Sequence, residues 1–91
     1  MLIRSQNREV LINLNSTAGI EIAEGPIKTI ITSYITGCSY LLGEYSNKAK
    51  AMKVLDMIQE AYCKFMSVKN DDAWGGKESV FYMPADSEVE A

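Results

Sequence analysis

A short stretch near the C-terminus, Trp74-Gly75-Gly76-Lys77, has the glycine and lysine content of a phosphate-binding loop. Such a loop has the form GxxxxGK followed by Ser or Thr, because backbone amides and the lysine hold phosphates while the hydroxyl holds magnesium. Here Asp71 occupies the first glycine position and Glu78 the hydroxyl position. The motif fails at both ends, so we expect a loop with Trp74 as its apolar anchor.

Acidic side chains in the same stretch raise the question of a metal site. Asp71 and Asp72, together with Glu78, could bind a hard cation, but the DxDxDG spacing of a calcium loop is absent. The chain contains no histidine, which removes the commonest general base and the commonest zinc ligand. We therefore expect a solvated acidic loop, with no metal and no cofactor.

Two cysteines, Cys38 and Cys63, are the candidate nucleophiles. A reactive thiolate needs a cationic neighbour or a base. Lys64 follows Cys63 directly, but adjacent residues of a helix point about 100° apart. We expect both thiols to be reduced, buried and structural. With no paired acid and base and no activated nucleophile, the sequence predicts no enzymatic activity.

The five tyrosines and the single tryptophan offer a different kind of chemistry. Tyrosine and tryptophan are favoured at binding surfaces because they bury apolar area and keep a polar group available. Tyr62 falls on the apolar stripe of the expected helix and should lie in the core. Tyr34 and Trp74 are the better candidates for a binding surface.

The elements that position these residues follow from a change of hydrophobic period at Ser46. Before it, apolar residues alternate in short runs, and from Asn47 to about Val68 they recur every three to four residues. Ser46 is the expected N-cap of this helix. The expected strands cover residues 2–5, 10–14, 20–22, 27–36, 40–42 and 79–83. The fold class is α+β: an antiparallel four- to five-stranded β-meander with one long α-helix packed on one face.

The net charge of −3 is unevenly placed, because residues 69–91 carry a net −4 and residues 1–68 a net +1. We expect residues 1–85 to form a single domain and residues 86–91, with Asp86, Glu88 and Glu90, to form a fraying acidic tail. An acidic chain without a basic stripe is a poor candidate for direct binding to nucleic acid. No apolar run is long enough for a transmembrane helix and no signal peptide is recognisable, so we expect a cytoplasmic protein without a membrane partner.

Two segments carry a resemblance to a known group of proteins. The first is Met1-Leu2-Ile3-Arg4-Ser5-Gln6 with Leu11-Ile12-Asn13-Leu14, and the second is Leu42-Gly43-Glu44-Tyr45-Ser46 leading into residues 51–58. Together they resemble short, mostly uncharacterised prophage and mobile-element proteins of Gram-positive bacteria. The resemblance implies an accessory phage gene in a bacterial host, and such proteins often antagonise host defences. Its motifs are structural, so it assigns no functional residue.

These observations lead to one main hypothesis and two alternatives. The main hypothesis is a non-enzymatic binding protein that inhibits a host defence system by contact with a host or phage protein. Its expected contact surface comprises Tyr34, Asp71, Asp72, Trp74, Asp86 and Glu88. One alternative is an oligomeric sponge that sequesters a nucleotide signal in pockets lined by tyrosines and by lysines such as Lys28 or Lys48. The other is a structural or regulatory phage protein, and a homodimer is compatible with each of the three.

Overall fold

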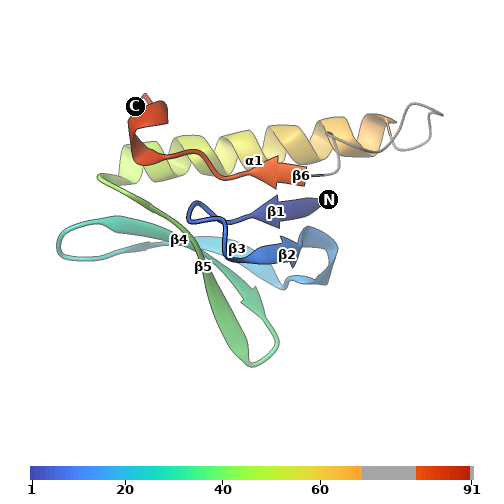
Figure 1. Cartoon of the computed structure of the whole chain (residues 1–91), viewed down its shortest axis with the longest axis horizontal. Coiled ribbons are helices and arrows are strands. Elements are labelled where there is room, and N and C mark those ends of the chain that lie inside the picture. Colours follow the sequence, from blue (N-terminus) through green and yellow to red (C-terminus); the bar gives the residue numbers. More distant parts are fainter. Residues whose placement is uncertain (69–79, 91) are drawn as a thin grey trace.

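The computed structural model of this chain describes residues 1–68 and 80–90, and it has an α+β fold (Figure 1). Two small sheets and one long helix enclose the core. The strands are β1 (Leu2–Arg4), β2 (Leu11–Asn13), β3 (Gly19–Glu24), β4 (Thr29–Ile35), β5 (Cys38–Tyr45) and β6 (Val80–Tyr82). The helix is α1 (Lys48–Val68), and two short 3₁₀ helices are η1 (Leu14–Ser16) and η3 (Asp86–Glu88).

The first sheet has the strand order β2-β1-β6. β1 is antiparallel to β2 and parallel to β6, and Ile3 lies between Ile12 and Phe81 in the register. Ile3 is fully buried and Ile12 is nearly so, so this row faces the core. Because side chains alternate along a strand, the neighbouring row through Arg4 faces outward.

The second sheet is an antiparallel meander with the order β3-β4-β5. Gly37 has a φ of 80° in the turn between β4 and β5, a conformation that glycine adopts without strain. Ile31 and Ser33 of β4 are fully buried, whereas Tyr34 is half exposed. One face of this sheet therefore packs on the core, and the other face is open to solvent.

The expected single meander of four to five strands is correct only for β3, β4 and β5. Within residues 1–68 and 80–90, six strands are instead divided between two sheets, and one strand pair is parallel. The 3₁₀ helix η1 interrupts the path between β2 and β3, which separates the sheets. β6 reaches β1 only after the chain has passed through the second sheet and α1, a connection long enough for parallel pairing. A prediction that pairs only strands adjacent in the sequence does not reveal that β6 pairs with β1.

The long helix begins at Lys48, as the change of period predicts, but its cap differs from the expected one. The side chain of Asn47, not that of Ser46, accepts a hydrogen bond from the Lys50 amide at 2.8 Å. α1 packs against β3, β4 and β5. Its buried positions are Ala51, Val54, Ile58 and Phe65.

The C-terminal segment packs against the domain, in contrast to the fraying tail expected from its acidity. Val89 is only 5% exposed and belongs to the core cluster. The carboxylate of Asp86 accepts a hydrogen bond from the Ser46 amide at 2.8 Å and lies 3.5 Å from the Lys50 ammonium. Burial of one apolar residue and a carboxylate at the start of a helix account for this docking.

Both cysteines are exposed, which corrects the expectation that they are buried. Cys38 lies at the exposed start of β5, and Cys63 lies on the solvent side of α1.

In the part of the chain that the structure describes, no helix is long and apolar enough to cross a membrane.

Candidate functional site

The residues singled out from the sequence do not form one surface among the described residues. Tyr34 is 50% exposed on the outer face of the second sheet. Asp86 and Glu88 lie in η3, beside the first turn of α1. Asp71, Asp72 and Trp74 lie outside the described residues.

The carboxylates of Asp86 and Glu88 both accept hydrogen bonds from backbone amides of this chain. The Asp86 carboxylate accepts a hydrogen bond from the Ser46 amide, and this bond is the main reason that the pKa of its carboxyl group is lowered. The nearby Lys50 ammonium adds to the lowering, and partial desolvation opposes it. The Glu88 carboxylate accepts a hydrogen bond from the Ala85 amide at 2.8 Å. These contacts favour a structural use of the two side chains, at the junction of α1 with the C-terminal segment.

A different cluster stands out on the outer face of the first sheet. Arg4 lies directly between Leu11 of β2 and Tyr82 of β6 in the strand register. All three side chains are exposed, with Leu11 at 53% and Tyr82 at 55%. Exposed leucine and tyrosine beside an arginine are the composition of a contact surface, since tyrosine and arginine are enriched at binding hot spots.

The turn between β1 and β2 adds a second guanidinium group to this row. Arg8 has a φ of 68° in that turn, and its guanidinium carbon lies 5.8 Å from the centre of the Tyr82 ring. This distance is within the range of a cation–π contact. The Arg4 Nε donates a hydrogen bond to the Arg8 carbonyl at 3.0 Å, which ties the two arginines together. We call Arg4, Arg8, Leu11 and Tyr82 the basic face.

The arginines of the basic face differ from several other cations of the chain in having no acidic partner among the described residues. The ion pairs among the described residues are Lys28–Glu44, Lys48–Glu24 and Lys50–Asp86. Neither Arg4 nor Arg8 has a described carboxylate within the 4.0 Å that defines an ion pair. In a chain with a net charge of −3, this is a local concentration of unpaired positive charge.

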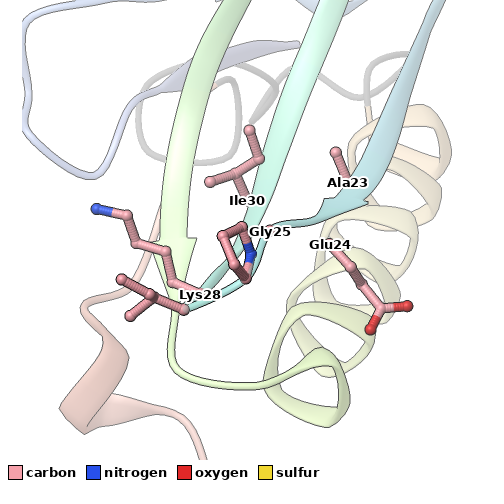
Figure 2. A pocket seen from close by; sticks show the side chains of 7 residues that line it. Ala23, Glu24, Gly25, Lys28 and Ile30 are labelled. Carbon is pink, nitrogen blue, oxygen red and sulfur yellow. The ribbon is translucent and has the colours of Figure 1, made fainter.

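A second feature is a hollow of about 280 Å³ at the turn between β3 and β4. Figure 2 shows Glu24 and Lys28 extending to opposite sides of this turn, with Ala23 and Ile30 on the strands behind it. Ile27 at the tip is 87% exposed. The hollow is mainly apolar, and its two charged side chains already pair with Lys48 and Glu44.

Neither feature is a metal site. Among the described residues, no three His, Cys, Asp or Glu side chains are placed so that they could hold a metal ion. Comparison with known proteins gives no assignment either, because no family model, no curated protein and no solved structure matches this chain.

The basic face escaped sequence analysis because its members come from three separate segments. Arg4 and Arg8 are four residues apart in the sequence, but Arg4 lies on strand β1 and Arg8 lies in the turn that follows it. Tyr82 joins them through the parallel pairing of β6 with β1. The available signal was the alternation of Leu2, Ile3 and Arg4, which already puts Arg4 on the face opposite the buried Ile3.

Proposed function

We propose that this chain is a non-enzymatic binding protein of phage or prophage origin that acts by contact with a partner protein, and that the basic face makes the contact. The phage origin is supported by the resemblance of residues 1–66 to prophage proteins. The observation that carries the proposal is the pair of guanidinium groups of Arg4 and Arg8, which have no carboxylate partner in residues 1–68 and 80–90 and lie beside an exposed tyrosine ring.

The chemistry of the basic face specifies the partner surface. Arginines bind carboxylates through paired N–H donors, so the partner presents aspartate or glutamate side chains. Leu11 and Tyr82 on either side of Arg4 supply apolar area that excludes water from such a contact. An acidic patch with an apolar rim on a host defence protein fits this arrangement, and binding there would block that protein.

Affinity capture with charge-reversed variants tests the proposal. Tagged protein is recovered from phage-infected cells, and bound proteins are identified by native mass spectrometry. We expect a defined partner to bind the original chain and to be lost with Arg4→Glu or Arg8→Glu. Lys53→Glu, at an exposed position of α1, is the matched control, because it makes the same charge change and should retain the partner.

A plaque assay on a defence-bearing host then tests the inhibitory role. Expression of the original chain and of Lys53→Glu should restore plaque formation, whereas Arg8→Glu should not. Retention of the partner by both arginine variants, or no partner at all, would contradict the proposal.

A nucleotide sponge is the second candidate, and the basic face supports it better than the lysines named from the sequence. The Lys28 Nζ lies 2.8 Å from Glu44 Oε1, and the Lys48 Nζ lies 3.4 Å from Glu24 Oε1, so both lysine charges are already paired. Tyr82 could stack on a base while Arg4 and Arg8 bind phosphate. Copurified nucleotide would appear as excess absorbance at 260 nm, and its loss with Tyr82→Ala would favour the sponge over protein contact.

A further inference from the structure

The outer face of the second sheet carries two hollows where β3 presents its small residues. Gly19 lies opposite Tyr34 in the register, and Ala23 lies opposite Ile30. A small side chain next to a large one leaves a depression in the sheet surface. The hollow beside Gly19 has a volume of about 410 Å³, and the one beside Ala23 is the 280 Å³ hollow of Figure 2.

Glu21 lies between these hollows on the same face of β3. Residues 19, 21 and 23 of a strand share one face, and the two hollows are therefore about 13 Å apart along the strand. Glu21 is exposed and has no ion pair with any described residue. We call Gly19, Glu21, Ala23, Ile30 and Tyr34 the Glu21 face, which presents a carboxylate between two depressions.

The basic face protrudes where the Glu21 face is hollow, and it carries positive charge where the Glu21 face carries a carboxylate. Its central row presents Arg4 between two exposed apolar side chains, Leu11 and Tyr82. These two side chains start from strands about 10 Å apart, since each strand spacing is close to 4.8 Å. This separation is a few ångströms shorter than the distance between the two hollows.

We propose that the chain assembles head to tail, with the basic face of one copy packed on the Glu21 face of the next. Arg4 then pairs with the partner's Glu21, while Leu11 and Tyr82 occupy the two hollows. This inference rests on the proposed role of the basic face in protein contact, and it names a second copy as one partner of that face.

The geometry of the two rows fixes how the sheets meet. The row through Arg4 runs across the strands of its sheet, whereas the row through Glu21 runs along β3. Matching the rows therefore crosses the strands of the two sheets at nearly 90°, which is one of the two usual packing modes of sheets.

Charge excludes the symmetrical alternatives on these surfaces. Two basic faces would bring arginines together, and two Glu21 faces would bring carboxylates together. When the contact between unlike faces runs head to tail, it is heterologous, so it closes into a ring or extends into a filament. Ile27, which is 87% exposed beside the Ala23 hollow, adds apolar area to the same contact.

Charge exchange between the two faces tests this assembly. Light scattering and native mass spectrometry of the full chain should show oligomers for the original sequence. Arg4→Glu and Glu21→Arg should each weaken association by at least about tenfold. An equimolar mixture of the two variants should restore the oligomers, because the altered faces carry exchanged charges and the unaltered faces remain complementary.

Matched variants separate the specific contact from net charge and from misfolding. Lys53→Glu and Glu90→Lys make the same charge changes at exposed positions elsewhere, and both should assemble like the original chain. Gly19→Val should fill one hollow and abolish assembly without loss of fold, because a Cβ at Gly19 meets nothing within 4 Å.

A chain that remains monomeric even at ~1 mM would overturn the assembly, as would a mixture of the two variants that stays monomeric. A monomer that still captures a host protein through Arg4 and Arg8 would leave the proposed function standing. Conversely, oligomers without any captured partner would support the assembly and contradict the inhibitory role.

Discussion

The side-chain amide of Gln6 pairs with the backbone of Glu44 in the way that a neighbouring strand would. Gln6 Oε1 accepts a hydrogen bond from the Glu44 amide at 2.9 Å, and Gln6 Nε2 donates one to the Glu44 carbonyl at 3.1 Å. The backbone N–H of Gln6 also donates a hydrogen bond to the Leu42 carbonyl at 2.7 Å. One residue thus reproduces the paired bonds of an antiparallel ladder and covers part of the β5 edge.

The first prediction concerns this amide. Gln6→Ala should lower the free energy of unfolding by roughly 1–3 kcal/mol, because it leaves the Glu44 backbone groups without protein partners. It also removes the bond from Nε2 to the Pro84 carbonyl, which ties in the C-terminal segment. Urea unfolding measures the loss, with Gln59→Ala on the exposed side of α1 as the control. Equal stability of the two variants would show that the amide is dispensable.

The second prediction compares two glycines on the two outer strands of the same sheet, Gly19 on β3 and Gly43 on β5. A Cβ at Gly43 would lie 3.0 Å from the Tyr45 ring and 3.3 Å from Met83 Cε, whereas a Cβ at Gly19 meets open space. Gly43→Ala should destabilise the fold by roughly 1–3 kcal/mol through overpacking. Gly19→Ala should be close to neutral, so a similar loss in both variants would contradict the packing argument. Thermal unfolding followed by circular dichroism gives the comparison.

Local patterns predicted individual elements well and their assembly less well. The helix from Lys48 to Val68 follows from its apolar period, and β4 follows from its run of β-branched residues. The parallel pairing of Arg4 with Tyr82 does not follow, because it joins residues at opposite ends of the chain. Sequence periodicity reports which face of an element is buried, and it contains no information on which distant strand completes the sheet.

The same limit explains what the sequence revealed of the candidate surfaces. Tyr34 was expected at the surface from its place on β4, and it is half exposed there. The acidity of Asp86 and Glu88 predicted free carboxylates, but the structure uses both to bind backbone amides near the start of α1. Charge is visible in a sequence, whereas the backbone group that it satisfies depends on the tertiary fold.

The third prediction concerns the pH dependence of the Asp86 contact. The pKa of this carboxyl lies below its ordinary 3.8 in the folded chain, chiefly because the Ser46 amide donates a hydrogen bond to the carboxylate. A depressed pKa contributes stability that is present above pH 3.8 and is lost as the pH falls through the folded value. Asp86→Asn should therefore have a lower Tm than the original chain at pH 7, and the two should converge in strong acid. Glu90→Gln is the control, and a constant difference at all pH values would exclude the linkage.

The fourth prediction concerns the phenol of Tyr45 in alkaline solution. Tyr45 is 1% exposed and its hydroxyl donates a hydrogen bond to the Pro84 carbonyl at 2.8 Å. Burial, and then the nearby carboxylates of Asp86 and Glu88, raise the pKa of this phenol from 10.0 to about 12. Between these values the unfolded chain has lost a proton that the folded chain retains, so rising pH favours unfolding.

The shift corresponds to a stability contribution on the order of 2–3 kcal/mol, which is present in full below pH 10.0 and is lost as the pH rises to about 12. Tyr45→Phe should be less stable at neutral pH, because the Pro84 carbonyl loses one of its two donors, but its stability should fall less steeply across this range. Tyr34→Phe on the exposed face should retain the full slope. Denaturant unfolding at stepwise pH values measures both slopes, and identical slopes for Tyr45→Phe and the original chain would show that another group controls the alkaline transition.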